Sequence, residues 1–381
     1  MGSIWCGIFV ITEELYMSEF LHKNIDTVFI MLGNSCNLNC EYCLQHPLVT
    51  KALPKDINPD IYKFLRSISQ EQEQIITLQF YGGEPLVYFD TIVDIVNELN
   101  TNTDIKFNYS IITNGKLLDE NKINFFNKNN FQVTISWDGH MSEDTRHYDV
   151  FKNNKSLYNI KKLAISGVLS GYAYPRELLN DFHLISSIYK AKTGRRLGIN
   201  IDLIMDTSLE NRNICNLDMQ KLKDDYDYIF KNYKLSREKK FNELDQDYTV
   251  THLYYAMSTY NTVKSRNNYL NNCGNGFNIL NLDLEGNLYS CHNTSDSIAN
   301  IYTPFWEYIS NLIRQDNNIQ NIKKCNNCDA IGICMGGCKL LSDEVRNRYY
   351  CKAKKIIAQS IKENEVSFQN GPNSCTPKES N

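Results

Sequence analysis

The segment LGNSCNLNCEYCLQH, residues 32–46, brings three cysteines close together at Cys36, Cys40 and Cys43. An iron–sulfur cubane usually takes four cysteine thiolates, so a loop that supplies three leaves one iron free to bind another molecule. The loop is therefore a candidate active site. Taken alone, it could equally be part of a zinc site or an incidental group of thiols.

Composition and charge limit the classes of protein to consider. The chain has 381 residues, 42% of them hydrophobic, and a net charge of -4, so neither nucleic acid nor an anionic membrane is an expected partner. Its length predicts one large domain with an appendage, and no apolar run is long enough to span a membrane. The N-terminus lacks an export signal, so we expect a cytoplasmic protein whose 13 cysteines bind metal rather than form disulfides.

Short β-like runs alternate with helical patterns across the first half of the chain. The expected strands are 26–33, 75–82, 107–114, 131–138, a weaker 168–175, and 198–205. The expected helices are 58–69, 90–99, 119–128, 156–165 and 177–192. Strands that each precede a helix predict a parallel α/β sheet, wound as a barrel or partial barrel.

Polar, glycine-rich motifs follow the first four of these strands. Parallel α/β folds build their active sites at the carboxyl ends of the strands. The glycines would let the backbone approach a ligand closely, and a carboxylate beside them could accept hydrogen bonds from an ammonium group. The candidate ligand-binding residues beyond the cysteine loop are Gly82, Gly83, Glu84, Thr113, Asn114, Ser136 and Asp138.

The second half of the chain differs in composition from the first. Residues 206–272 are polar and helical and look like a bridge, and 277–291 form a candidate hairpin that turns at Glu285 and Gly286. Seven cysteines then dominate: Cys273, Cys291, Cys325, Cys328, Cys334, Cys338 and Cys351. They are too many for one metal centre and suffice for two.

The spacing of Cys36, Cys40 and Cys43 resembles the signature of the radical S-adenosylmethionine (SAM) superfamily, and the seven later cysteines with Gly286 resemble a SPASM domain. The resemblance implies a partial (β/α)6 TIM-like barrel with a small C-terminal cysteine-rich domain. It also implies three [4Fe-4S] clusters and bound SAM, whose reductive cleavage gives a 5′-deoxyadenosyl radical. Zinc ribbons are the alternative for the C-terminal cysteines.

The same resemblance assigns roles to individual residues. Gly82, Gly83 and Glu84 hold the SAM amino group, and the strand-end polar residues line the SAM site. Arg146 reaches the methionyl carboxylate, and Tyr42 lies next to adenine.

The resemblance also divides the later cysteines into two auxiliary clusters. One takes Cys325, Cys328, Cys334 and Cys351, and the other takes Cys273, Cys291 and Cys338. The second has three assigned ligands, so its fourth is an open position, the substrate, or one of three further thiols. Those thiols are Cys6, Cys215 and Cys375, each of which could instead be structural.

His292 marks a departure from one group of relatives. Anaerobic sulfatase-maturating enzymes have a catalytic aspartate directly after the cysteine that matches Cys291, and this chain has His292 there. We keep His292 as a candidate catalytic residue. The departure disfavours formylglycine formation.

The resemblance predicts an oxygen-sensitive peptide maturase that forms a thioether or another side-chain crosslink in a precursor peptide or protein. Its partners would include an electron donor such as flavodoxin or ferredoxin. Leader recognition would come from a separate protein or from the barrel itself. Formylglycine formation is the competing reaction, and a metal-stabilised peptide-binding module is the non-enzymatic alternative. The expected divisions are an N-terminal extension (1–25), the barrel (26–205), the bridge (206–272), the SPASM domain (273–365) and a flexible tail (366–381).

Overall fold

The computed structural model describes residues 25–45, 56–71, 75–101, 104–206, 212–265, 278–315, 325 and 327–364. Cys6, Cys273 and Cys375, the N-terminal extension apart from Ile25, and the C-terminal tail therefore lie outside the described residues. None of the described helices is long and apolar enough to cross a membrane.

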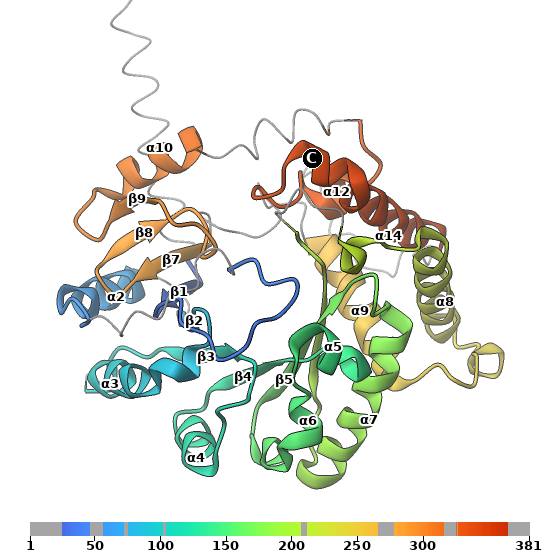
Figure 1. Cartoon of the computed structure of the whole chain (residues 1–381), viewed down its shortest axis with the longest axis horizontal. Coiled ribbons are helices and arrows are strands. Elements are labelled where there is room, and N and C mark those ends of the chain that lie inside the picture. The colour runs from blue at the N-terminus through green and yellow to red at the C-terminus, as the bar shows by residue number, and fades with distance from the viewer. Residues whose placement is uncertain are drawn as a thin grey trace, which may run out of the picture.

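One curved sheet organises the molecule, with strand order β6-β5-β4-β3-β2-β1-β7-β8-β9 (Figure 1). Strands β1 to β6 are mutually parallel neighbours in sequence order, which confirms the expected parallel α/β sheet. Their bounds are Thr27–Met31, Thr77–Tyr81, Asn108–Thr113, Gln132–Ser136, Leu163–Leu169 and Gly198–Leu203. The two ends of the sheet, β6 and β9, do not pair with each other within the described residues, so the barrel is partial.

The C-terminal hairpin extends this sheet. Strand β7 (Ile279–Asp283) pairs in parallel with β1, and β8 (Asn287–Tyr289) and β9 (Ser297–Asn300) follow it antiparallel. Gly286 lies in the turn with φ +92°, a conformation that favours glycine. The expected hairpin and its turn are confirmed.

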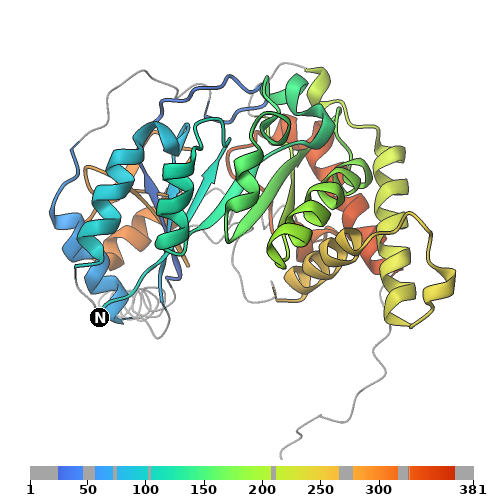
Figure 2. The same ribbon diagram turned by 90° about the horizontal axis from the view of Figure 1, so that it is seen from below.

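Helices cover the outer side of the curved sheet (Figure 2). Each of α2, α3, α4 and α7 follows a strand, as the sequence patterns predicted. The helices of this part are α2 (Asp60–Glu71), α3 (Phe89–Leu99), α4 (Glu120–Lys128), α5 (Ser142–Arg146), α6 (Val150–Asn153) and α7 (Pro175–Thr193). Their apolar faces and the strands share one core, in which Phe126 and Phe131 pack with ring centroids 4.8 Å apart.

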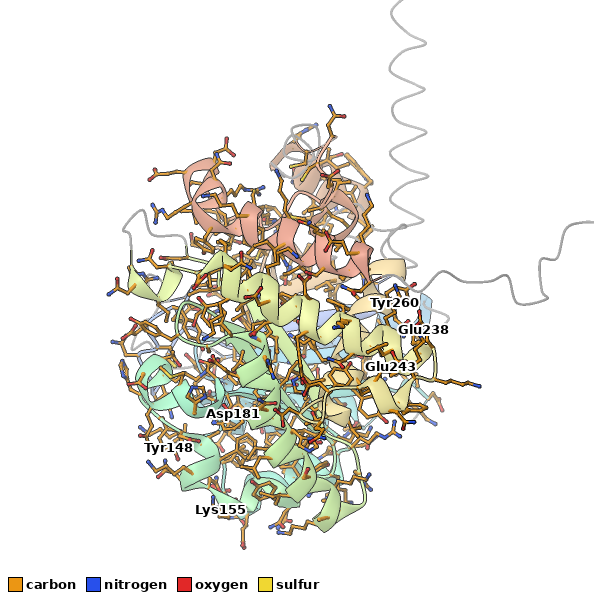
Figure 3. The ribbon with its side chains drawn as sticks, turned by 90° about the vertical axis from the view of Figure 1, so that its right-hand side faces the viewer. Tyr148, Lys155, Asp181, Glu238, Glu243 and Tyr260 are labelled. Carbon is orange, nitrogen blue, oxygen red and sulfur yellow. The ribbon has the colours of Figure 1, made fainter. Side chains whose placement is uncertain are left out.

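A second core joins the predicted bridge to the C-terminal helix. It contains the buried side chains of Leu222, Ile229 and Phe230 on α8 and of Tyr349 and Tyr350 before α14. Helix α14 lies across α8 on the face shown in Figure 3. The helices here are α8 (Met219–Arg237), α9 (Val250–Ser265), α12 (Ile331–Cys334), α13 (Asp343–Val345) and α14 (Cys351–Glu363). Helix α10 (Phe305–Gln315) lies beside β9 instead, and its buried residues belong to the first core.

The fifth strand is not where the sequence analysis expected it. We predicted a helix over 156–165 and a strand over 168–175, whereas β5 begins at Leu163 and ends at Leu169. The residues of β5 alternate between buried and half-buried, which is the pattern of a strand. Position 167 in this strand is a glycine, and a Cβ there would come within 2.8 Å of the Phe182 ring.

Candidate active site

The cysteine loop follows β1 and packs against the turn after β2. The Gly83 N–H donates to the Gly33 carbonyl at 3.0 Å, and the Glu84 N–H donates to the Ser35 carbonyl at 2.9 Å. A Cβ at Gly83 would come within 2.6 Å of the Asn34 carbonyl oxygen. The sequence analysis expected this glycine to approach a ligand, but what its backbone approaches closely is the cysteine loop.

Glu84 is a fully buried carboxylate at the end of β2. One oxygen accepts from the Thr113 hydroxyl at 2.6 Å and from the Leu86 N–H at 3.0 Å, and the other accepts from the Asn114 N–H at 2.8 Å. Burial raises the pKa of Glu84, and these three hydrogen bonds oppose that rise. The carboxylate is thus held rigidly in a place where an ammonium group would favour its charged form.

The three thiols of the loop line a cavity of about 570 Å³. Burial raises the pKa of Cys40 to about 11 and also raises the pKa of Cys36. Thiols with raised pKa values bind metal only when the metal displaces their protons. The same cavity is lined by the other predicted residues except Asp138, namely Tyr42, Gly82, Gly83, Glu84, Thr113, Asn114, Ser136, Arg146 and His292.

One buried donor within the loop lacks an acceptor. The Asn114 side-chain oxygen accepts from the Lys116 N–H at 3.0 Å, so its amide nitrogen is the group that donates to Asn37, at 2.8 Å. The Asn37 amide nitrogen is then left buried without a hydrogen-bond partner. The backbone N–H groups of Asn37 and Leu38 donate to the Cys36 sulfur. Soft thiol ligands surrounded by donors fit an iron–sulfur cluster, whose sulfurs accept hydrogen bonds.

Asp138, which the sequence analysis placed among the cofactor-binding residues, lies behind the cavity wall. It is fully buried and does not line the cavity. Its carboxylate accepts from the Tyr42 hydroxyl, from Thr145 at 2.8 Å, from Arg146 at 3.0 Å and from the Val168 N–H at 2.9 Å. Asp138 therefore positions Tyr42 and Arg146 along the cavity wall, and its oxygens are already occupied.

His292 closes the cavity from the hairpin side. Its ring stacks on Phe29 at 4.5 Å and meets Tyr81 edge-on at 4.5 Å, and its Nδ1 lies 3.3 Å from the Asn281 amide oxygen. Burial, with a smaller effect of Lys339, lowers the pKa of His292 to about 4, so the imidazole is neutral at neutral pH.

Several cavity residues were missed by the sequence analysis. Phe29, Tyr81, Ser166 and Asp202 come from β1, β2, β5 and β6 and project from the inner face of the sheet into the cavity. The signal that could have found them is the alternation along each strand, because every second side chain faces the barrel interior.

Four of the later cysteines lie within electrostatic range of one another. Burial, with smaller contributions from Cys351 and Cys325, raises the pKa of Cys334 to about 11. Cys325 and Cys328 act in the same way on Cys351. These are the four thiols expected to share one auxiliary cluster. No three Cys, His, Asp or Glu side chains converge tightly enough to hold a single metal ion in the part of the chain that the structure describes.

Of the three cysteines expected to hold the second cluster, the structure describes Cys291 and Cys338. Cys291 is buried beside the cavity, and the Cys338 carbonyl accepts from the buried Arg346 at 2.6 Å. Cys215, one candidate for the missing ligand, lies in the second core and contacts the Asp206 carboxylate at 3.2 Å. Burial and Asp206 raise the pKa of Cys215 to about 12, which fits a structural thiol.

Comparison with known proteins places this site in a family. Residues 30–169 match the radical SAM superfamily. This chain has a radical SAM domain. A radical SAM domain makes the chain a radical SAM enzyme, and such a domain implies a [4Fe-4S] cluster and SAM.

Two relatives of the radical SAM enzyme have names that describe an activity. The radical SAM cyclopropyl synthase TigE of Paramaledivibacter caminithermalis is 25% identical over 353 residues, 83% of this chain and 68% of that protein. A cysteine-type anaerobic sulfatase-maturating enzyme of Clostridium novyi is 30% identical over 181 residues, 44% of this chain and 48% of that protein. The chain thus matches about half the length of the second relative.

Solved structures share the fold of this radical SAM enzyme. anSMEcpe with bound AdoMet aligns with TM-score 0.60 and 17% identity over 89% of this chain and 98% of that chain. Streptococcus suis SuiB bound to precursor peptide SuiA aligns with TM-score 0.55 and 16% identity over 88% of this chain and 77% of that chain.

Proposed function

We propose that this chain is a radical SAM maturase that removes hydrogen from a residue of a ribosomally made peptide and forms a thioether or another side-chain crosslink. The observation that carries the proposal is the shared cavity. The cysteine loop, the buried Glu84 and His292 of the C-terminal hairpin all line it. A volume of about 570 Å³ leaves room for a cofactor and a substrate side chain together.

Each residue has a role that follows from its contacts. Cys36, Cys40 and Cys43 would hold three irons of the cluster, and Glu84 would accept hydrogen bonds from the SAM ammonium group. Tyr42 and Arg146, both fixed by Asp138, would frame the rest of the cofactor. When bound, the cluster and SAM would supply a 5′-deoxyadenosyl radical that takes up one hydrogen atom of the peptide. The second hydrogen of the crosslink would leave as a proton, and its electron would pass to an auxiliary cluster.

The cysteine sets also support two auxiliary clusters. Cys325, Cys328, Cys334 and Cys351 would bind one, and Cys291, Cys338 and Cys273 would contribute to the other. A flavodoxin or ferredoxin would deliver electrons, and a separate protein would recognise a leader sequence. Peptide substrates find support in two solved structures of the same fold, anSMEcpe with Cp18Cys peptide and SuiB with SuiA.

Oxidation of serine or cysteine to formylglycine is the second candidate reaction. The similarity to sulfatase-maturating enzymes favours it. His292 disfavours it, because a neutral imidazole that stacks on Phe29 and meets Tyr81 edge-on stands where those enzymes have an aspartate. The enzyme superfamily assignment removes the non-enzymatic peptide-binding module from consideration.

The test is anaerobic reconstitution with iron and sulfide, followed by SAM, a reductant and a library of random peptides that each contain one cysteine. We expect 5′-deoxyadenosine and peptides that lose two hydrogens while retaining sulfur. Loss of the cysteine sulfur with a hydrazide-reactive aldehyde would instead establish formylglycine formation. Absence of 5′-deoxyadenosine from reconstituted protein would contradict both reactions.

A further inference from the structure

Strand β6 ends the sheet and has a groove along its outer edge. Within the described residues only β5 pairs with β6, so its other edge faces no strand. Residues 199–203, five in a row, line a hollow of about 160 Å³. Successive side chains of a strand point to opposite faces, so a hollow lined by five consecutive residues runs along the strand edge. We call this hollow the β6 groove.

The opposite wall of the β6 groove is rich in hydrogen-bonding groups. Helix α9 contributes Ser258, Thr259 and Thr262, and α14 contributes Lys354. Ser258 and Thr262 are exposed. Hydroxyl groups both donate and accept hydrogen bonds, so this wall suits the amide groups of a peptide main chain.

The β6 groove adjoins the radical SAM cavity. Asp202 and Leu203 line both hollows. The Asp202 carboxylate accepts from the Asn200 amide at 2.7 Å and from the Ser166 hydroxyl at 3.4 Å, which fixes it at this junction. The groove is also lined by Ile333, the residue before Cys334. The groove therefore has lining residues in common with the candidate active site and lies beside the C-terminal cysteine set.

We propose that the β6 groove binds the substrate peptide as an extended segment, which pairs with the outer edge of β6 and leads the residue to be modified into the cavity. This inference rests on the proposed function. An edge strand presents N–H and C=O groups that an extended peptide can match, and pockets along the edge then select side chains. The groove follows a single strand edge and shares Asp202 and Leu203 with the cavity, which argues for the substrate rather than a second copy of this protein.

Two neighbouring positions on α9 provide a matched test. Ser258 lines the groove and is exposed, whereas Met257 is exposed (38%) and does not line it. Ser258→Trp fills the groove, and Met257→Trp adds the same ring outside it. The probe is a messenger-RNA display library of random peptides that each contain one central cysteine, selected on the reconstituted wild-type enzyme with SAM.

We expect Ser258→Trp to weaken binding of the selected peptides by about tenfold or more and Met257→Trp to leave it unchanged. SAM cleavage without peptide should be equal in all three proteins, which separates loss of the groove from loss of the active site. In the wild type, peptide should slow hydrogen–deuterium exchange of the amides in residues 199–203. Three results would each overturn the proposal. They are equal peptide affinity of Ser258→Trp and wild type, a selection in which the wild type retains no peptide, and unchanged hydrogen–deuterium exchange in β6.

The failure of the proposed function has a different signature. It appears as absence of 5′-deoxyadenosine from wild-type enzyme, whereas failure of the β6 groove leaves that product intact and only the peptide measurements unchanged. If the wild type binds peptide through β6 but makes no 5′-deoxyadenosine, the proposed binding site stands and the proposed reaction is contradicted.

Discussion

Two buried carboxylates near the cavity, Glu84 and Asp138, differ in their hydrogen-bond and ion-pair partners, and we therefore expect them to differ in role. Glu84 accepts hydrogen bonds from a hydroxyl and two backbone N–H groups. Asp138 forms an ion pair with Arg146 at 3.0 Å, with both side chains almost fully buried. The negative charge of a carboxylate held by neutral donors can still pair with a cationic ligand. The charge of a carboxylate paired with a guanidinium is already neutralised inside the protein.

Replacing Glu84 with Gln should weaken SAM binding by about tenfold to a hundredfold, since a charge-assisted hydrogen bond contributes about 1.5–3 kcal/mol. Burial raises the pKa of Glu84, so wild-type affinity for SAM should fall as the pH falls toward that raised value and the carboxylate becomes neutral. The Gln variant should lack this component of the pH dependence. Equilibrium dialysis of SAM on reconstituted protein measures both effects. A Gln variant with wild-type affinity would exclude Glu84 as the ammonium acceptor.

Replacing Asp138 with Asn should act on stability instead. The substitution leaves the Arg146 guanidinium buried without its countercharge, which costs about 3–5 kcal/mol of unfolding free energy. Denaturant unfolding of the apoprotein measures this loss without any contribution from the cofactor. The exposed Asp60, which pairs with Lys63, supplies the control, and Asp60→Asn should change stability little. Equal stability of the two variants would show that Asp138 does not hold the site together.

At the scale of elements, the cysteine loop is clamped from both sides. The Glu41 N–H donates to the Thr145 carbonyl at 3.0 Å, and the Glu41 carbonyl accepts from Arg212. Arg212 pairs with Asp206 at 2.6 Å, and the Asp206 N–H donates to the Tyr349 hydroxyl at 3.0 Å. The loop of the first cluster is thereby bonded to the segment that precedes Cys351.

Replacing Arg212 with Met should loosen the cysteine loop and let a chelator remove iron from the first cluster about tenfold faster, given the strength of a charged hydrogen bond. The rate is followed by the loss of visible absorbance in a variant that lacks the later cluster ligands. Arg195 offers a control, because it also donates to a backbone carbonyl, that of Lys161 at 2.8 Å, but lies outside the site. Equal rates in Arg212→Met and Arg195→Met would show that the clamp does not matter for cluster retention.

The elements that the sequence predicts well are those in which one spacing dominates. Strands β1, β2 and β4 alternate between half-buried and buried residues, and the predicted positions of β1 to β4 and β6 are confirmed. Residues 156–169 carry two patterns, because Leu157, Ile160 and Leu163 fit a helix while Leu163, Ile165 and Leu169 fit a strand. Pairing with both β4 and β6 decided in favour of the strand. The sequence likewise identified the motifs at the strand ends. It could not show that Asp138 rather than Glu84 forms an ion pair with Arg146.

At the scale of the whole molecule, one sheet brings distant parts of the chain together. Strand β7 pairs with β1 across some 250 residues of sequence, with Thr27 opposite Ile279. This pairing places His292 on Phe29, at the edge of the radical SAM cavity. No local pattern predicts a partner so far away in sequence, because parallel pairing is set by tertiary packing.

His252 on α9 should make the stability of the whole fold depend on pH. It is fully buried, and desolvation lowers its pKa from 6.5 to about 4. The folded state keeps it neutral while the unfolded state takes up a proton, so stability should fall by about 3 kcal/mol as the pH falls from 6.5 to 4. The variant His252→Phe should lose this part of the pH dependence, and replacement of the exposed His140 should not. Chemical unfolding at several pH values measures the slope, and identical slopes in wild type and His252→Phe would contradict the assignment.

The last prediction concerns the iron content of the whole chain. The ten cysteines of the two sets support three cubane clusters, which corresponds to about twelve iron atoms per chain after anaerobic reconstitution. Replacing Cys36, Cys40 and Cys43 together with Ala should lower this to about eight and abolish 5′-deoxyadenosine formation. The later cysteines should keep their iron because Cys325, Cys328, Cys334 and Cys351 lie near one another around α12 and the start of α14, apart from the loop after β1. Iron and sulfide assays with electron paramagnetic resonance measure both quantities. Wild-type protein with about four iron atoms, or with zinc in their place, would contradict the auxiliary clusters, and continued SAM cleavage by the triple variant would contradict the active site itself.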